Sequence, residues 1–476
     1  MTEPPAQRLA LPALIAMVVG SMVGAGIFSL PQTFGRVTGG VGALIAWAIA
    51  GGGMLMLALV FQTLARRKPG LDAGVYAYAK AGFGNYPGFL SALGYWAVCC
   101  LGNVSYWVLI QSTLGAYYPV LGDGSTVTAV AISSVGLWTV HFLILRGVKQ
   151  AAALNTIVTV AKIIPIILFL LFALYGFDAA IFYDNLDGGP GLDNAPILEQ
   201  VRGTMLVTVF VFVGIEGASV YSRYARRRAD VGLATILGFA GVLSLLVLVT
   251  MLSYGVLLRP DLAALRNPSM AGVLEAVVGR WGAVFVSVGL IISVLGAYLA
   301  WSLLAAEVLF SAARMESMPA FLARENRNRV PSAALWLTNG LVQAFLIAMI
   351  FAEEAFILAV KLTSSMILLP YLLTAAYALK LAWLEPDPTE TARARRGDFI
   401  RATLATIYAA GLIYAGGLKF LLLSLLIYAP GTILFAIAQR ERGHRIFTTT
   451  EAILFAILIA GAALAFAALQ TGAIRL

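Results

Sequence analysis

The sequence predicts an all-α integral membrane protein, and three observations support this fold class. Of the 476 residues, 61% are hydrophobic and 12% are charged, whereas a soluble chain is about half apolar and about a quarter charged. Apolar runs of membrane-spanning length recur along the whole chain. Arginines and lysines concentrate in the short segments between alternate runs. This pattern excludes a soluble enzyme, a disulfide scaffold, a coiled coil and a disordered chain.

The apolar runs predict thirteen membrane spans. A helix crosses the hydrocarbon core with about 20 residues. The first run is not a cleaved signal peptide, because it is too long and carries Pro31 at its far end. The boundary between the eleventh and twelfth runs is poorly marked, so twelve spans is the alternative count. The runs are 12–35, 42–65, 86–118, 127–145, 151–176, 201–221, 233–257, 282–312, 333–352, 355–383, 399–417, 419–439 and 447–471.

Loop charge predicts that the N-terminus is cytoplasmic. With this orientation, 23 arginines and lysines lie in inner segments and 7 in outer ones, and the outer loop 177–199 holds five carboxylates. Lys162 and Lys361 lie within spans. Positive charge favours the cytoplasmic side of a membrane protein. The net charge of +9 therefore reflects membrane topology, and we expect no nucleic-acid partner.

Two spans carry signals for a broken helix. The first contains Gly20–Phe28 followed by Pro31, and the sixth contains Phe210–Ser219, which includes a glutamate. Irregular backbone at membrane depth lines a cavity, and matched breaks in two halves indicate a transporter binding site. Because each half has five spans, the halves would be inverted repeats. Unwound backbone offers amides for a carboxylate and carbonyls for an ammonium, although glycines in such helices also serve close packing.

The expected architecture is one transporter domain over residues 1–476, with a ten-helix core in which helices 1 and 6 are broken. The first inverted repeat would be 1–176 and the second 200–383. Residues 399–476 would add two or three accessory C-terminal helices.

Four ionisable residues fall within predicted spans, where charge is costly and usually functional. Glu216 lies in the break of the sixth span, and Glu307 lies in the eighth span. We interpret both as groups that recognise or gate a cation, Glu216 as a substrate-binding residue and Glu307 as a gating or coupling residue. A structural pair or a helix-end charge is the alternative for Glu307. Lys162, in the fifth span, would pin helices together as a bound cation does. Lys361 is a further coupling candidate, or it snorkels to the outer interface.

Several other side chains are candidates for substrate contact. Trp301 lies mid-span, where its ring would face a cation or pack in the core. The same two readings apply to Phe210, Tyr95 and Tyr106, and the two tyrosines are also gating or coupling candidates. Asn103 would bond across helices or to a ligand. Nothing in the sequence matches a phosphate loop, a catalytic triad, a metal-ligand cluster or a dinucleotide fingerprint, so we expect neither enzymatic activity nor a cofactor or metal.

Three motifs resemble the amino acid–polyamine–organocation superfamily. They are Met22–Pro31 in the first span, Gly214–Ser219 in the sixth, and the inner loop Pro69–Gly84. Within the superfamily the chain most resembles the basic amino acid/polyamine antiporters, and among those the exchangers of arginine for ornithine. Supporting segments are Phe61–Ala65, Gly94–Trp96 with Leu101–Tyr106, and Leu143–Gly147.

The resemblance implies a role for each motif position. Gly24, Ala25 and Gly26 would receive the substrate carboxylate, with Ala25 standing where related exchangers have a serine. Carbonyls of Val23, Phe210 and Val213 would hold the α-ammonium. Trp301, at the family's spacing from Pro319, would stack on the guanidinium. Other implied contacts are a gate tyrosine at Tyr95, a gate glutamate at Glu216, a phenylalanine at Phe210 in place of a gating tryptophan, and side-chain contacts from Cys99 and Asn103.

The resemblance implies electroneutral exchange of L-arginine for L-ornithine, by alternating access, across the cytoplasmic membrane of a bacterium. The exchange would supply arginine catabolism through the deiminase pathway. The protein would lie in the lipid bilayer, with a homodimer as one option for its assembly. Alternatives are lysine/cadaverine exchange, arginine/agmatine exchange or proton-coupled uptake of such a cation. An amino acid sensor would be expected to have a soluble signalling domain, and a channel would be expected to have rings of polar residues.

Overall fold

A computed structural model describes residues 11–71, 74–147, 151–186, 188–189, 195–216, 228–385 and 391–475. These residues form helices joined by turns, with no strand among them. The elements of the first predicted repeat are α1 (Leu11–Met22), η1 (Ala25–Ser29), α2 (Leu30–Val37), α3 (Gly40–Arg67), α4 (Val75–Phe83), α5 (Asn85–Gly115), η2 (Pro119–Leu121), α6 (Val127–Leu145) and α7 (Ala151–Tyr175).

The second predicted repeat and the connection before it form a similar series. The elements are α8 (Ala179–Leu186), α9 (Ile197–Phe212), α11 (Arg228–Tyr254), α12 (Arg259–Ala264), α13 (Ser269–Val278), α14 (Arg280–Arg314), η4 (Ala320–Ala323), α15 (Ser332–Ala348), η5 (Met349–Phe351) and α16 (Ala355–Leu384). Two long C-terminal helices follow, α17 (Ala392–Glu441) and α18 (Thr449–Gln470).

The described residues support a polytopic membrane protein. Nine of their helices are long and apolar enough to cross a membrane, and the number rises to eleven if each of two bent helix pairs is one crossing. The sixth predicted span continues from α9 into 217–227, which lies outside the described residues. The total of twelve or thirteen spans therefore stays a prediction.

The poorly marked boundary between the eleventh and twelfth runs falls inside α17. This helix has 50 residues, which would extend about 75 Å at 1.5 Å per residue, more than twice the roughly 30 Å hydrocarbon core. Gly417 interrupts it with φ +76° and ψ 166°, a conformation that suits glycine because it has no Cβ. Two crossings joined at Gly417 account for this length.

The helix contacts have the reciprocal pattern that two similar repeats would produce. Helix α1 packs on α11, and its counterpart α9 packs on α3. In the same way, α5 packs on α16 and α14 packs on α7, while the equivalent helices α6 and α15 pack on each other. Each of these contacts between two spans has an equivalent contact between the corresponding spans of the other repeat. Two similar repeats would give this pattern, and their inverted orientation stays a prediction.

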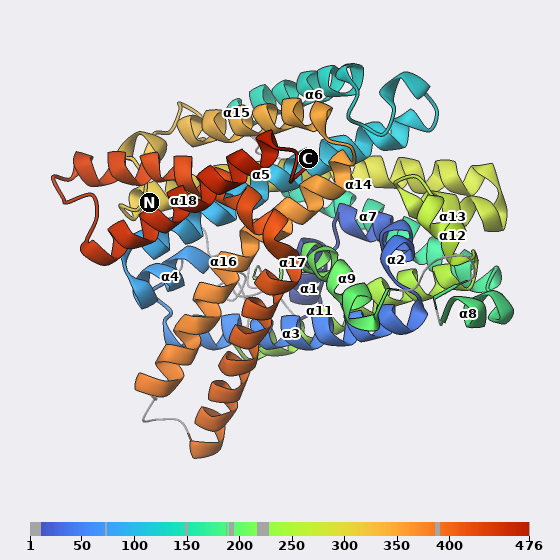
Figure 1. Ribbon diagram of the computed structural model, residues 1–476, viewed down its shortest axis with the longest axis horizontal. Helices are drawn as coiled ribbons and strands as arrows, with labels where there is room; N and C mark the ends of the chain where they lie inside the picture. Colours follow the sequence, from blue (N-terminus) through green and yellow to red (C-terminus); the bar gives the residue numbers. More distant parts are fainter. Residues whose placement is uncertain are drawn as a thin grey trace.

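The long helices surround a buried centre in which α5 is the most enclosed span (Figure 1). Helices α6 and α15 run side by side along one edge, and α8, α12 and α13 gather at one end. Helices α16 and α17 project from the body at the opposite end as an antiparallel pair. The broken helix α1–α2 and helix α9 lie inside this frame, which positions the two breaks at the centre.

Candidate functional site

The two predicted breaks meet in the structure. Helix α1 ends at Met22, and Gly24 is extended, with φ −124° and ψ −160°, before η1 begins at Ala25. In the second break, Gly214 has φ +109°. A Cβ on Gly214 would lie 2.3 Å from the backbone oxygen of Ser21. The two breaks therefore approach each other so closely that only glycine fits at residue 214.

A second glycine, Gly26, allows the first break to pack closely against the end of α9. A Cβ on Gly26 would lie 2.7 Å from Phe210 Cδ1 and 2.7 Å from Val211 Cγ1. Gly26 belongs to η1, and the two obstructing side chains belong to the last turn of α9. The start of η1 is thus held against the end of α9.

This arrangement brings the amides at the start of one helix close to the carbonyls at the end of another. The first amides of a helix have no intrahelical partner, and neither do its last carbonyls. The amides of Ala25 and Gly26 begin η1, and the carbonyls near Val213 end α9. A carboxylate suits the former and an ammonium suits the latter. Together they can bind the α-amino and α-carboxyl groups of an amino acid.

Two of the three carbonyls that the resemblance assigns to the ammonium already accept hydrogen bonds. The Val23 carbonyl accepts from Lys162 Nζ at 3.0 Å, and the Phe210 carbonyl accepts from the Val213 amide at 3.2 Å. A carbonyl oxygen has two lone pairs, so each retains capacity for one more donor.

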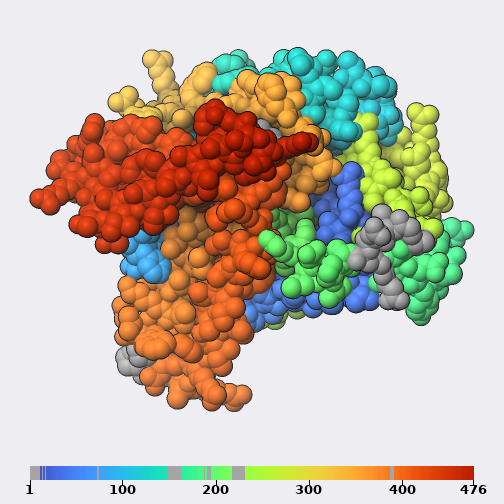
Figure 2. Space-filling view, in the orientation of Figure 1, coloured from blue at the N-terminus to red at the C-terminus, as the bar shows by residue number. Residues whose placement is uncertain are grey.

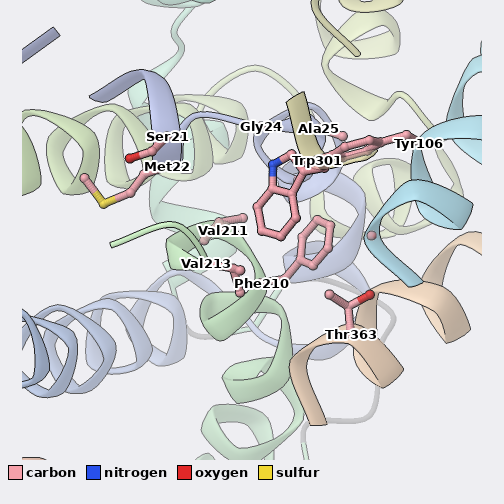
Figure 3. Close-up of a pocket in the computed structure, with 12 residues that line it drawn as sticks. Ser21, Met22, Gly24, Ala25, Tyr106, Phe210, Val211, Val213, Trp301 and Thr363 are labelled. Atoms are coloured by element: carbon pink, nitrogen blue, oxygen red, sulfur yellow. The ribbon is translucent and has the colours of Figure 1, made fainter. Parts of the chain in front are cut away.

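A cavity lies beside the breaks, with an empty volume of about 360 Å³ that includes open solvent. The predicted residues Gly24, Ala25, Gly26, Phe210, Val213, Tyr106 and Trp301 all line it. Trp301 and Phe210 enter the same space from α14 and α9, with Tyr106 at one side and Thr363 at another (Figure 3). The cavity thus combines bare backbone on one wall with aromatic rings on another, which suits a cationic amino acid.

Glu216 is buried within the second break and is hydrogen-bonded to two tyrosines. Its Oε1 accepts a hydrogen bond from Tyr95 on α5 at 2.8 Å, and its Oε2 accepts from Tyr371 on α16 at 2.6 Å. The Gly214 amide also donates to Oε2, at 3.1 Å. This carboxylate therefore connects the break after α9 to two long helices. The rest of the predicted motif, Gly217–Ser219, lies outside the described residues.

Lys162 connects a third helix to the first break. The buried ammonium on α7 donates to the Gly20 carbonyl at 2.8 Å and to the Val23 carbonyl at 3.0 Å. These carbonyls belong to the end of α1 and the residue after it, where the negative end of the helix dipole favours a cation. The contact is the one expected of an internal tether.

Cys99 and Asn103 lie on α5 behind the cavity wall. Both are fully buried, and neither is among the described residues that line the cavity. Asn103 Nδ2 donates to Ser302 Oγ at 3.1 Å. This bond connects α5 to α14 beside Trp301, so Asn103 in this structure bonds across helices, one of its two expected arrangements.

Two of the predicted coupling residues lie away from the cavity. Glu307 is an exposed residue on α14. Its neighbour Tyr76 lies on α4, where burial raises the pKa of the tyrosine hydroxyl to about 12 and the Glu307 charge contributes in the same direction. Lys361 lies near the start of α16, with Nζ 5.6 Å from the ring centre of Phe420. Neither residue is among the described residues that line the cavity, and a gating or coupling role for either stays a prediction.

Comparison with known proteins decides the family. The family model described as amino acid permease matches residues 9–463. The chain belongs to the amino acid permease family. It is 54% identical to the arginine/ornithine antiporter of Pseudomonas aeruginosa, over 100% of both chains.

Two further relatives of this permease carry other substrate names. It is 42% identical to an L-lysine transport protein of Corynebacterium glutamicum, over 99% of this chain and 97% of that protein. It is 37% identical to an arginine/agmatine antiporter of Chlamydia pneumoniae, over 90% of each chain. The permease is accordingly a membrane transport protein and not an enzyme.

The structure adds lining residues that the sequence did not single out. Ser21, Met22, Val211, Gly102 and Thr363 also line the cavity. Ser21, Met22 and Val211 lie within the predicted breaks Gly20–Phe28 and Phe210–Ser219, although none of the three was a candidate contact residue. Gly102 and Thr363 come from unbroken helices, where nothing in the local sequence distinguishes a cavity-facing residue from a packed one.

Proposed function

We propose that this permease exchanges L-arginine for L-ornithine across the bacterial cytoplasmic membrane by alternating access. The observation that carries the proposal is the cavity in which free backbone of the two breaks faces Trp301 and Phe210. The 54% identity to an arginine/ornithine antiporter over the whole chain supports the choice of substrates.

The cavity suggests one orientation for arginine. Its carboxylate would accept hydrogen bonds from the amides of Ala25 and Gly26, at the positive end of η1. Its α-ammonium would donate to carbonyls near Val213. Its guanidinium would then lie against Trp301, where a desolvated cation–π contact is worth about 2 kcal/mol. Ornithine would keep the backbone contacts and place an ammonium on the same ring.

Glu216 and Lys162 would make the breaks responsive to the substrate. Glu216 lies in the second break and is hydrogen-bonded to α5 and α16, and Lys162 on α7 is hydrogen-bonded to the first break. A substrate that shifts η1 or the end of α9 would therefore also change the bonds to α5, α7 and α16. Such a linked set of contacts is what a two-state transporter needs in order to open one side at a time.

Equal charge on the two substrates makes the exchange electroneutral. A potential of 100 mV is worth about 2.3 kcal/mol for each charge moved. A one-for-one exchange of two +1 amino acids moves no net charge, so it would run on the concentration gradients alone. We place the N-terminus in the cytoplasm because this puts most loop arginines and lysines inside.

A lysine or agmatine exchanger is the second candidate, and the relatives named for these substrates favour keeping it. Agmatine has no carboxylate and would leave the amides of Ala25 and Gly26 without an anionic partner. An unpaired buried donor costs about 1–3 kcal/mol. The geometry therefore favours substrates that retain the carboxylate.

Counterflow in proteoliposomes tests the proposal. Vesicles holding the purified protein are loaded with ornithine, arginine, lysine, agmatine, cadaverine or buffer, and uptake of labelled arginine is followed. We expect fast uptake with ornithine or arginine inside and little uptake into empty vesicles. Equal uptake into empty vesicles that rises with an imposed proton gradient would contradict exchange. Faster uptake with agmatine than with ornithine inside would reassign the counter-substrate.

A further inference from the structure

A second cavity lies between α3, α16 and α17, and it shares no residue with the first. Its empty volume is about 270 Å³, including open solvent. The walls are largely apolar, with Val60, Leu64, Leu381 and Ala402 among the residues that form them. Arg67, Asp398 and Arg401 also line it. A cavity with apolar walls and cationic groups suits a ligand that has both an anionic and an apolar part.

The charges around this cavity leave an excess of positive groups. Asp398 is buried, and its carboxylate accepts from Arg401 at 3.0 Å and from Arg66 at 3.3 Å. The carboxylate of Asp398 thus holds two guanidiniums in place, but its single negative charge balances only one of their two positive charges. Lys68 is paired with Glu385 at 3.3 Å, and Arg67 donates to the uncharged backbone oxygen of Glu385.

The sequence around the cavity also has more positive than negative charges. Segments 66–68 and 385–401 together carry seven arginines and lysines and four carboxylates. Arg393, Arg395 and Arg396 of this set are exposed on the first turns of α17. Basic clusters at the end of a transmembrane helix attract anionic lipid headgroups, by about 1 kcal/mol for each arginine or lysine.

Aromatic and aliphatic side chains place this cavity at the level where hydrocarbon meets water. Trp383 is 70% exposed at the end of α16, and its ring centre lies 5.9 Å from that of Phe399. Exposed tryptophan is typical of the membrane interface. From Ile400 onward, α17 presents further exposed aliphatic side chains, Leu404 and Ile407. The ends of α16 and α17 project from the body of the molecule (Figure 2), so this surface faces the surroundings of the protein.

We propose that this cavity binds an anionic phospholipid, with the phosphate at Arg67 and Arg401 and an acyl chain along the exposed aliphatic face of α17. A soluble anion would gain nothing from the apolar walls, and a zwitterionic lipid would gain less from the excess positive charge. The lipid would stabilise the packing of α17 on α3 and α16. This site is separate from the substrate cavity and does not depend on the proposed exchange.

Native mass spectrometry of the purified full-length protein tests this site. The protein is titrated with phosphatidylglycerol and, separately, with phosphatidylcholine of the same acyl chains. We expect one phosphatidylglycerol to be retained at least about fivefold more tightly. Arg67→Gln should weaken its retention about fivefold, the loss expected of one cationic contact. Ala382→Phe, which fills the cavity from a partly exposed lining residue, should weaken it without changing any charge.

Arg395→Gln is the matched control, because Arg395 is exposed nearby on α17 but does not line the cavity. Retention in this variant should stay within about twofold of the unmodified protein. Three results would overturn the proposal. One is equal retention of both lipids, and another is an Arg395→Gln loss as large as that of Arg67→Gln. The third is displacement of the lipid by millimolar glycerol 3-phosphate, which would indicate a site for a soluble anion.

Discussion

Substitution of Gly214 is the strongest test of how the two breaks meet. Alanine would adopt φ +109°, a backbone region that costs a side chain about 1–3 kcal/mol. Its Cβ would lie 2.3 Å from the Ser21 oxygen and 2.9 Å from the Ser21 carbonyl carbon. These are backbone atoms, so the contact is relieved only when one break moves, and overpacking of this kind costs a further 1–3 kcal/mol or so.

The expected loss in Gly214→Ala is therefore about 2–6 kcal/mol, shared between folding stability and substrate binding. A loss of 2 kcal/mol in binding alone is roughly a 30-fold rise in Kd. Thermal unfolding in detergent and arginine binding by isothermal titration calorimetry measure the two contributions.

Two matched variants grade the result. Gly26→Ala meets side-chain atoms at 2.7 Å, which can move, so its loss should be smaller than that of Gly214→Ala. Gly340→Ala on α15 has nothing within 4 Å of its Cβ and should bind arginine as the unmodified protein does. If Gly214→Ala matched Gly340→Ala in both arginine binding and thermal stability, the close approach of the two breaks at Gly214 and Ser21 would be refuted.

Substitutions at Glu216, Tyr371, Lys162 and Trp301 test individual contacts of the site. Glu216→Gln should slow exchange at least tenfold, because a charge-assisted hydrogen bond to a tyrosine is worth about 1.5–3 kcal/mol. Tyr371→Phe should reproduce part of this loss. An unchanged exchange rate in Glu216→Gln would contradict a gating role for Glu216. Lys162→Met removes both hydrogen bonds from the ammonium to the end of α1, so it should lower the unfolding temperature and abolish exchange. Full exchange in this variant would show that transport does not need the Lys162 contact. Trp301→Leu should raise the Kd for arginine about tenfold or more through loss of the cation–π contact, with a smaller change in Trp301→Phe; calorimetry that shows equal affinity would place the guanidinium elsewhere.

The sequence predicted the features of the site that depend on local chemistry. Glycine at two matched breaks, a glutamate within one of them and a lysine among apolar residues are visible without a structure, because each conflicts with a lipid-facing helix. The structure brings Gly214 to Ser21 and Lys162 to Val23, contacts between segments that the sequence treats separately.

Features that depend on helix rotation and depth could not be predicted. Thr363 and Gly102 line the cavity from unbroken helices, whereas Glu307 and Lys361 are not among the described residues that line it. A charged residue within an apolar run has no mark that tells whether it faces the bundle or the surface. The break at Gly417 within α17 was poorly marked for a related reason, since glycine in a membrane helix serves packing as often as it serves a turn.

The arginine-bound structure, determined by electron cryomicroscopy of the unmodified protein, tests the central claim most directly. We expect the substrate carboxylate within hydrogen-bond distance of the amides of Ala25 and Gly26, and the guanidinium on the face of Trp301. Arginine bound in the opposite orientation, with its guanidinium at the breaks, or bound outside the cavity between η1, α9 and α14, would contradict this account.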